Sequence, residues 1–196
     1  MINLEKGVVV DFSGSLAEDV AKKGIKRCCE KCNISPEMII PIIKDPFLED
    51  YLSSEIVADC HQIFREEIEN AKPDPNVLKA MLYCQDKNYK IFISSNGFAD
   101  AIEKALEKSE FSDLIVTLVF GREDGIKKEH IEKIRRIYDL EEIIIFGDDP
   151  SDFQNTGDFK VALNPSGKNP ERFLGVNVDR IINVPLTIEI VKEFVR

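Results

Sequence analysis

The first strong pattern along the chain is a short apolar run that ends in a carboxylate. Valines fill positions 8–10, Gly7 precedes them, and Asp11 follows at once. A continuous apolar run of this kind is typical of a parallel strand that is buried on both faces of its sheet. Comparable runs recur at 90–94, 114–120, 143–146 and 160–163. We therefore predict a strand at each of these places, and a further short strand at 179–184.

Apolar positions spaced three and four residues apart predict helices between these strands. Between the first strand and residue 72, this spacing predicts helices at 16–32, from Pro36 onward, and at 54–71. Later helices are predicted at 77–86, 98–108, 128–138 and 186–195. The alternation of helices and strands indicates an α/β fold with a doubly wound, mostly parallel sheet. We therefore predict an α/β core formed by residues 1–15 and 73–196, with a helical insertion at 16–72 directly after the first strand.

Charge and composition narrow the classes of partner. The chain of 196 residues carries 26 basic and 36 acidic side chains, a formal net charge of −10. This excess of negative charge argues against nucleic acids and anionic membrane surfaces as partners. No apolar segment approaches the roughly 20 residues of a membrane span, and the N-terminus lacks the basic and cleavable parts of a signal peptide. The five cysteines form no regular disulfide framework. We therefore expect a cytoplasmic protein, whose oligomeric state the sequence does not indicate.

Polar residues follow three of the predicted strands. Asp11 ends the first strand, Ser95 and Asn96 follow the second, and Asp148 follows the fourth. Ligands of open α/β sheets bind beyond the carboxyl ends of the strands, so these groups should converge on one crevice. A turn that contains Gly14 could present backbone amides to an anion there. Two buried carboxylates repel each other unless a cation lies between them, and hard oxygen ligands suit Mg²⁺. The alternative is that the aspartates only cap the helices that follow them.

In this order and spacing, the motifs resemble those of the haloacid dehalogenase superfamily, whose signatures cover most of the chain. The resemblance implies that Asp11 is the nucleophile and that Ser95 hydrogen-bonds the transferred group. Gly14 and Ser15 stand where the superfamily usually has Gly-Thr. The implied substrate-binding residues are Gly14, Ser15, Asn96 and Gly97. The implied reaction is phosphatase-like hydrolysis of a small phosphorylated metabolite.

The resemblance also implies a Mg²⁺ site with a lysine beside it. The segment at 147–152 resembles the acidic motif Gly-Asp-x-x-x-Asp that completes the metal site. The implied ligands are Asp11, the backbone carbonyl of Ser13, Asp148 and Asp152, the last of which could instead orient the lysine. If the following helix buries its isoleucines at 131, 134 and 137, Lys127 falls in the usual register and Lys128 lies one residue away. We therefore predict Lys127 as the catalytic lysine; the alternative is that both are solvated charges at a helix start.

The helical insertion resembles the small helical cap with which this superfamily closes its active site and selects its substrate. Two of its basic residues, Lys44 and Arg65, could meet an anionic group of a substrate. The favoured interpretation of each is nevertheless an ordinary surface charge. The substrate itself cannot be named from the sequence, because the contacts that select it lie in the insertion.

Three further features receive a structural interpretation. The Lys-Pro-Asp-Pro segment at 72–75 looks like the superfamily's lysine motif, but it precedes the second strand and is predicted to be the return to the core. The residues that resemble a zinc set are Cys29, Cys32, Cys60 and His61. Helical periodicity already explains Cys28, Cys32 and Cys60 as small buried residues. His61 and His130 show no evident partners and are predicted to be bystanders.

The sequence departs from the superfamily at one position. Its phosphatases usually carry an aspartate two residues after the nucleophile, which protonates the leaving group and then activates water, whereas this chain has Ser13. A hydroxyl cannot shuttle protons in this way near neutral pH, so an effect of about 10² to 10⁴-fold is missing unless it is replaced. Two alternatives to a phosphatase therefore stay open. One is carbon-centred chemistry, either halide displacement or phosphonate cleavage with Lys44 as the Schiff-base lysine; the other is a non-catalytic binding module.

Overall fold

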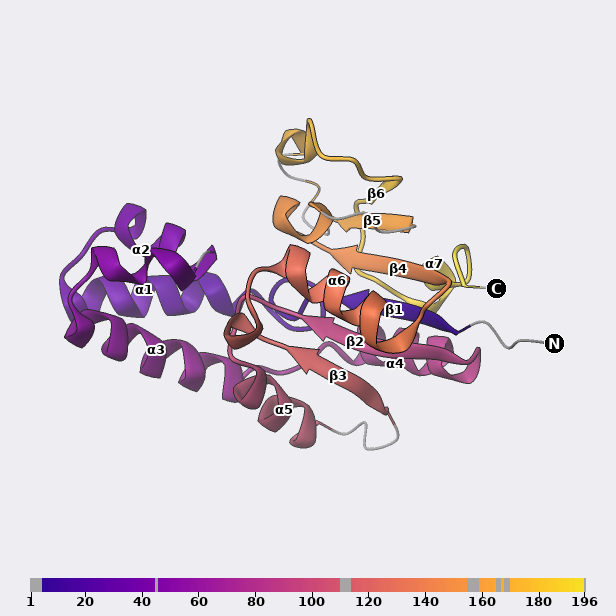
Figure 1. The fold of residues 1–196 in the computed structure, drawn as a ribbon, viewed down its shortest axis with the longest axis horizontal. Helices are drawn as coiled ribbons and strands as arrows, with labels where there is room; N and C mark the ends of the chain where they lie inside the picture. The colour runs from indigo at the N-terminus through magenta and orange to yellow at the C-terminus, as the bar shows by residue number, and fades with distance from the viewer. Residues whose placement is uncertain are drawn as a thin grey trace.

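The computed structural model describes residues 5–44, 46–109, 114–154, 159–164, 167 and 170–195. Its centre is a six-stranded sheet in the order β3-β2-β1-β4-β5-β6 (Figure 1). The strands are β1 (Lys6–Val10), β2 (Tyr89–Ser94), β3 (Val116–Phe120), β4 (Glu142–Gly147), β5 (Phe159–Leu163) and β6 (Arg180–Ile182). Every pair of neighbouring strands in this sheet is parallel. The predicted α/β class and doubly wound sheet are confirmed.

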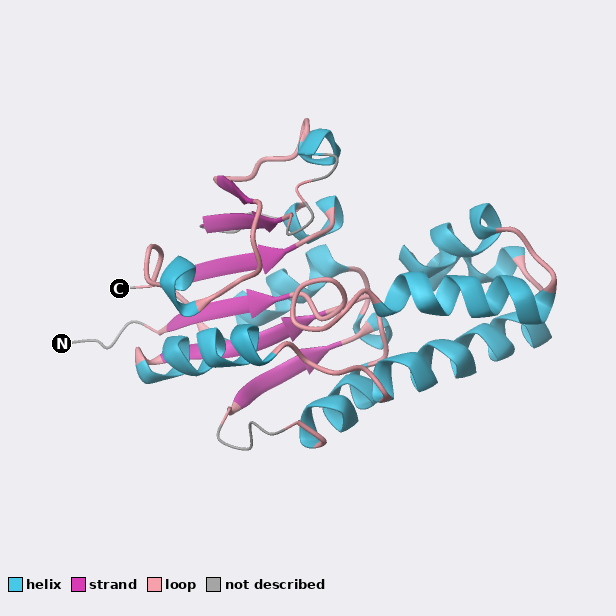
Figure 2. Cartoon of the chain, turned by 180° about the vertical axis from the view of Figure 1, so that it is seen from behind, coloured by secondary structure: helices cyan, strands magenta, loops and turns pink. Residues whose placement is uncertain are grey.

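Helices cover both faces of the sheet, because successive side chains of a strand point to opposite faces. Val8 and Val10 belong to one apolar cluster, and Val9 belongs to the other. The helices that cover the first cluster are α4 (Pro75–Asp86), α5 (Ala99–Glu107) and α7 (Ile188–Val191). The second cluster is covered by α6 (Lys127–Tyr138), which lies in front of the sheet in Figure 1, while α4 and α7 lie in front in Figure 2. The sheet is therefore buried on both sides, as its continuous apolar strands require.

The helical insertion lies beyond the carboxyl ends of the strands and not over a face of the sheet (Figure 2). Its elements are α1 (Val20–Cys32), α2 (Pro36–Lys44), the 3₁₀ helix η1 (Pro46–Tyr51) and α3 (Ser54–Glu69). The chain enters and leaves the insertion at adjacent points, because Ala17 pairs with Pro73 and the Asp74 N–H donates to the Leu16 carbonyl at 2.8 Å. This placement sets the insertion above the edge of the sheet where the polar strand ends meet.

Several predicted boundaries are wrong. Helix α1 begins at Val20 and not at residue 16, because the Asp19 side chain caps it by accepting from the Lys22 N–H at 3.0 Å. Strand β3 begins at Val116, two residues late, and α7 ends at Val191 and not at residue 195. On α6, the side chain of Ile137 is 56% exposed, although its periodic spacing predicts burial. The errors in bounds concern element ends, which an apolar pattern defines only to within a few residues.

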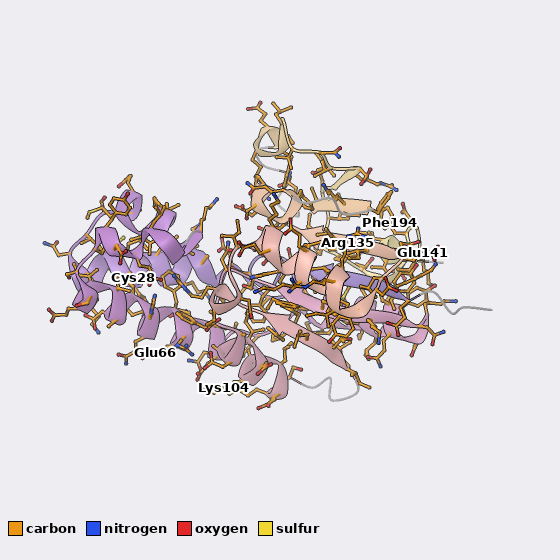
Figure 3. All side chains as sticks on the ribbon, viewed as in Figure 1. Cys28, Glu66, Lys104, Arg135, Glu141 and Phe194 are labelled. Carbon is orange, nitrogen blue, oxygen red and sulfur yellow. The ribbon has the colours of Figure 1, made fainter. Side chains whose placement is uncertain are left out.

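The features set aside in the sequence have structural roles. Asp74 caps α4 and Pro75 is its first residue, so segment 72–75 is the return from the insertion into the core. All five cysteines are free, and Cys28 lies among the helices of the insertion (Figure 3). The Cys28 thiol donates to the Cys60 carbonyl at 4.0 Å, and both side chains are buried. Burial raises the pKa of Cys28, so its thiol is protonated and packs as a small apolar group. Within the described part of the chain, none of the helices has the length and apolar character of a membrane span.

In the described part of the core, 3₁₀ helices follow β3, β4 and β5. They are η2 (Arg122–Asp124) after β3, η3 (Pro150–Phe153) after β4, and η4 (Pro170–Phe173) after β5. All three leave the sheet at its carboxyl edge, where ligands of open α/β sheets bind.

Candidate active site

Three neighbouring strands, β2, β1 and β4, each deliver one polar side chain to the same edge of the sheet. Asp11 directly follows β1, and its N–H donates to the Phe146 carbonyl of β4 at 3.0 Å. Ser95 directly follows β2, and Asp148 directly follows β4. Parallel strands in register bring these residues together without any further element. The sheet order reverses at β1, which is the position where such folds form their binding crevice.

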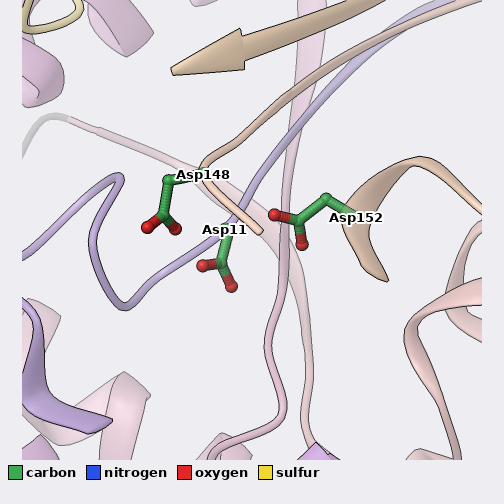
Figure 4. A group of neighbouring side chains, drawn as sticks. All are labelled: Asp11, Asp148 and Asp152. Carbon is green, nitrogen blue, oxygen red and sulfur yellow. The ribbon is translucent and has the colours of Figure 1, made fainter. Parts of the chain in front are cut away.

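A cluster of three carboxylates forms at this edge. The side chains of Asp11, Asp148 and Asp152 point toward one another (Figure 4), and one oxygen from each lies within 4.8 Å of the others. Asp11 and Asp152 are each 5% exposed. Asp152 comes from η3, where its Oδ2 accepts from the Asp149 N–H at 2.9 Å and so fixes the turn after β4. The turn therefore holds the third carboxylate in place against the other two.

Lys127 supplies the positive charge inside this cluster. Its Nζ donates to Asp11 Oδ1 at 2.8 Å and to Asp152 Oδ1 at 2.5 Å, and the residue is 5% exposed. It is the first residue of α6, where a cation opposes the helix dipole and needs other partners to be stable. Those partners are the two carboxylates, whereas the neighbouring Lys128 is exposed.

The charges of the cluster shift one another's protonation. Burial raises the pKa of Asp11, and the nearby Asp152 and Asp148 add to this effect while Lys127 opposes it. Burial, together with the charge of Asp152, raises the pKa of Asp148 to about 6. Burial alone would lower the pKa of Lys127, but attraction by Asp11 and Asp152 outweighs it and raises that pKa. Buried Asp11 and Asp152 and half-buried Asp148 therefore lie together with only one ammonium group bonded to the first two, which leaves an excess of negative charge.

This donor set fits Mg²⁺. Carboxylate oxygens are the hard ligands that Mg²⁺ takes, and a divalent cation would offset both the burial and the repulsion between carboxylates that raise the pKa values of Asp11 and Asp148. Asp11 and Asp148 are the residues best placed to hold it. Both oxygens of Asp152 already accept hydrogen bonds, from Lys127 and from the Asp149 N–H, so Asp152 is placed to orient its neighbours. The Ser13 carbonyl stays a predicted ligand.

A cavity of about 470 Å³ opens in front of the cluster. It lies between the helical insertion and the core and is lined by Asp11, Ser95, Asn96, Gly97, Lys127 and Asp148, among others. The basic side chains that line it are Lys22, Lys44, Arg122, Lys127 and Arg172. The acidic ones are Asp11, Asp19, Asp148 and Asp149. With a divalent cation bound, the positive charge would predominate, so an anion could bind here although the chain as a whole carries a net charge of −10.

The sequence matches none of the known protein-family models, and no curated protein matches it significantly. Solved structures, in contrast, match nearly the whole chain. A haloacid dehalogenase-like family hydrolase from Streptococcus pneumoniae matches with a TM-score of 0.71 at 16% sequence identity, over 97% of this chain and 98% of that chain. A hydrolase from Pseudomonas syringae matches with a TM-score of 0.73 at 14% identity, over 98% and 100% of the two chains. The chain has the fold of the haloacid dehalogenase-like hydrolases.

Other solved structures that match the chain bear the names of several different enzymes. A phosphonoacetaldehyde hydrolase-like protein from Oleispira antarctica matches with a TM-score of 0.69 at 8% identity, over 97% of this chain and 92% of that chain. Further matches are described as phosphoglycolate phosphatase, beta-phosphoglucomutase and L-2-haloacid dehalogenase. At these identities the similarity establishes the haloacid dehalogenase-like fold, and the reaction has to be argued from the site.

Of the predicted site residues that follow Asp11, one lines the cavity and two contact Asp148. Ser13 lines the cavity, and its Oγ accepts from the Ala21 N–H in the first turn of α1 at 3.3 Å. Gly14 and Ser15, predicted to bind substrate, are not among the cavity-lining residues and instead contact Asp148. The Ser15 hydroxyl donates to Asp148 Oδ1 at 3.5 Å. Gly14 has φ +84°, and a Cβ there would lie 2.5 Å from Asp148 Oδ2. Gly14 is therefore required so that the Asp148 carboxylate can approach this turn.

Lys44 and Arg65, the two basic residues of the insertion that could meet a substrate, differ in their position relative to the cavity. Lys44 lines the cavity, and its Nζ forms an ion pair with Asp149 Oδ2 at 3.1 Å. Arg65 pairs with Asp100 Oδ2 at 2.5 Å and lies over the Phe98 ring, with its guanidinium carbon 4.0 Å from the ring centroid. Arg65 therefore joins α3 to the core outside the cavity lining, whereas Lys44 reaches the site.

Arg122 is a site residue that sequence reasoning missed. It follows β3, is 8% exposed, and lines the cavity. Its guanidinium forms an ion pair with Glu49 of η1, which links the core to the insertion. The signal in the sequence is weak, because these two partners are 73 residues apart.

The prediction that the histidines lack partners is wrong. His61 Nε2 lies 2.9 Å from Glu49 Oε1. His130 is fully buried; its Nδ1 lies 2.9 Å from the Ser94 hydroxyl and its Nε2 3.0 Å from the Gly125 carbonyl. Burial lowers the pKa of His130 to about 4, so the ring is neutral near pH 7 and can donate to one partner and accept from the other. His130 thereby ties the end of β2 to the turn that precedes Lys127.

We expect Mg²⁺ to stabilise the protein more at pH 7.5 than at pH 5. Because the pKa of Asp148 is raised to about 6, the metal-free folded state binds more protons than the unfolded state between about pH 4 and 6. Its stability therefore falls as the pH rises through this window, and a cation that binds the ionised carboxylates restores it. Saturating Mg²⁺ should raise the thermal midpoint by roughly 5–10 °C at pH 7.5. An equal shift in an Asp148→Asn variant would show that Mg²⁺ binds elsewhere.

Replacing Lys127 with Ala should destabilise the metal-free protein by about 3–5 kcal/mol, because buried Asp11 and Asp152 would lose their shared cation. Replacing the exposed Lys128 with Ala should change the free energy of unfolding by no more than about 0.5 kcal/mol. Urea denaturation of both variants at pH 7.5 with a chelator measures the difference. A larger loss of stability in Lys128→Ala than in Lys127→Ala would assign the role to the other lysine.

Proposed function

We propose that this protein is a Mg²⁺-dependent phosphohydrolase of the haloacid dehalogenase superfamily that acts on a small phosphate ester through an aspartyl-phosphate. The observation that carries the proposal is Asp11, a buried carboxylate at a strand end, held by Lys127 beside Asp148 and lining the cavity. Bound Mg²⁺ would be held by Asp11 and Asp148 and would neutralise the phosphate oxygens.

Each step can be assigned to residues of the chain. Lys127 holds Asp11 Oδ1, so the carboxylate keeps a second oxygen with which to attack phosphorus. A bond between Asp11 and phosphorus forms while the bond to the leaving oxygen breaks, and that oxygen takes a proton from solvent. Water then attacks the phosphorus of the aspartyl-phosphate, loses a proton to solvent, and releases inorganic phosphate and the free carboxylate. Ser95 and Lys127, which both line the cavity, would bind the phosphate oxygens.

The charges of the site favour a phosphate over a neutral substrate. Halide displacement at carbon needs no cation, yet the cluster keeps Asp148 and Asp152 beside Asp11 at a cost in repulsion that a divalent cation would offset. A phosphate dianion would in turn be attracted by the basic residues on the cavity wall. In phosphoryl transfer, the acidic cluster would therefore bind the cation and the basic residues that line the cavity would attract the phosphate.

The test is a panel of phosphate esters incubated with and without Mg²⁺. We expect inorganic phosphate to be released from at least one class of ester, only when Mg²⁺ is present. Hydroxylamine added during turnover should trap an acyl-phosphate on Asp11, which peptide mass mapping would locate. Tight Mg²⁺ binding without hydrolysis of any ester would contradict the proposal and would favour a non-catalytic binding module.

One observation favours phosphonate cleavage as a second candidate function. This chemistry uses a lysine that forms a Schiff base with a carbonyl substrate, and Lys44 of the insertion lines the cavity. Against this, Lys44 is ion-paired with Asp149 and its side chain is 51% exposed, so an entering carbonyl group would have to displace Asp149. Borohydride treatment with an aldehyde phosphonate would reduce a Schiff base to a stable adduct. Mass mapping of such an adduct to Lys44, together with carbon–phosphorus cleavage, would replace the first proposal with this one.

A further inference from the structure

Part of the cavity has an apolar wall. Five large apolar residues of the insertion line it, namely Ile25, Ile40, Ile43, Phe64 and Ile68, and Phe98 adds to them from the core. Ile40 is 40% exposed, although it sits beside buried neighbours on α2. Phe64, Ile68 and Phe98 are buried by the protein itself, whereas Ile40 and the partly exposed Ile25 and Ile43 leave apolar surface open to the cavity. Covering apolar surface is favourable, so this open part of the wall indicates an apolar ligand group that covers it.

Several charged groups that line the cavity already have partners within the protein. Lys44 pairs with Asp149 at 3.1 Å, and Arg122 pairs with Glu49. Asp19 accepts from the Lys22 N–H at 3.0 Å as the cap of α1. Hydroxyl groups of a sugar-like ligand would have to displace these pairings or lie against isoleucine and phenylalanine, and a buried hydroxyl without a partner is costly. The wall therefore selects against a polyhydroxylated group.

We propose that this wall binds an apolar leaving group, so that the substrate class is phosphate esters of hydrophobic alcohols or phenols and not sugar phosphates. The inference deepens the proposed function and rests on it for the position of the phosphate at Asp11. The cavity volume of about 470 Å³ lies in the range of roughly 300–1,000 Å³ that small-ligand sites occupy. A phosphate at the carboxylate end would leave the remaining space to the ester group, against Ile40 and Ile43.

A series of para-alkylphenyl phosphates tests the inference in the wild-type protein. Lengthening the alkyl chain from methyl to propyl to pentyl barely changes the leaving-group chemistry but adds apolar surface. Each methylene that the wall buries should raise kcat/KM about fourfold. Para-hydroxyalkylphenyl phosphates of equal length are the matched polar controls and should gain much less. If the hydroxylated esters, or sugar phosphates, react as well as the pentyl ester, the inference is wrong while the phosphatase proposal survives.

Binding without catalysis separates the two proposals. Para-alkylbenzylphosphonates cannot be hydrolysed in this way, and titration calorimetry with Mg²⁺ gives their dissociation constants. We expect the Kd to fall about fourfold per methylene. This trend without hydrolysis of any ester would support the apolar site and overturn the proposed phosphatase. A Kd that does not change along the series, or no binding by any phosphonate, would overturn the apolar site.

Variants locate the wall. Ile40→Ser combined with Ile43→Ser should reduce the gain per methylene to less than about twofold, in kcat/KM and in Kd. Ile137→Ser is the matched control, because Ile137 is also an exposed isoleucine on a helix but does not line the cavity. If the folded double variant shows the same gain per methylene as the wild-type protein, Ile40 and Ile43 do not bind the alkyl group and the inference is wrong. If the double variant does not fold, Ile40→Ser alone carries the test, because Ile40 is already 40% exposed.

Discussion

Replacing Asp11 with Asn should reduce turnover by at least about 10⁴-fold while the protein stays folded. The amide cannot attack phosphorus, and losses of this size follow removal of a nucleophile on which the other groups depend. Asn has the same shape as Asp, and Lys127 would keep its contact with Asp152 at 2.5 Å, so the cluster should stay assembled. Phosphate release from the best ester of the panel, together with circular dichroism of the variant, measures both parts of the expectation.

The adjacent aspartates of the turn after β4 provide a matched comparison. Asp148→Asn should lose activity as severely as Asp11→Asn, because Asp148 is within 4.8 Å of the nucleophile. Asp149→Asn should keep activity within about tenfold, since the Asp149 side chain pairs with Lys44 and caps η3 by accepting from the Ser151 N–H at 2.9 Å. Near-normal turnover in either Asp11→Asn or Asp148→Asn would mean that the nucleophile and the metal site are assigned to the wrong residues.

The part of the site at the strand ends could be predicted from the sequence because the sheet imposes it. Asp11, Ser95 and Asp148 each follow a buried apolar run, and parallel strands in register place their carboxyl ends side by side. No long-range contact has to be guessed for this, only the strand class and the order of pairing. Their proximity follows from the same pattern that predicts the core.

Contacts between the insertion and the core could not be predicted in this way. Arg122 and Glu49 meet only because the insertion folds back over the carboxyl edge of the sheet, and nothing in their local sequence specifies that approach. His130 is on the buried face of α6, but its hydrogen-bond partner, the Ser94 hydroxyl, comes from β2. Ile137 shows the converse error, since its spacing on α6 is correct for burial and yet the sheet does not reach it. Periodicity predicts a helix face but not the extent of the surface that covers it.

Ser13 should make breakdown of the aspartyl-phosphate the slow step. Its hydroxyl cannot activate water as a carboxylate does, and its Oγ already accepts from the Ala21 N–H at 3.3 Å. Loss of leaving-group protonation should spare esters whose leaving groups are good, so nitrophenyl esters and acyl phosphates should react faster than alkyl phosphates. Rapid-quench measurements with such an ester should show a burst near one equivalent of the alcohol product, followed by slow turnover.

Ser13→Asp should accelerate the slow phase by about 10² to 10⁴-fold and erase the burst, because the new carboxylate can accept a proton from the attacking water. The position can accommodate it, since residue 13 faces the first turn of α1, where the Ala21 N–H and the helix dipole favour a negative group. Ser13→Asn is the matched control: it has the shape of Asp without its proton chemistry and should leave the slow phase unchanged. A wild-type protein that shows no burst and hydrolyses alkyl phosphates as fast as activated esters would contradict this account. It would mean that another group lining the cavity supplies the proton transfer, and Asp19, which caps α1 at the cavity wall, would be the first residue to replace.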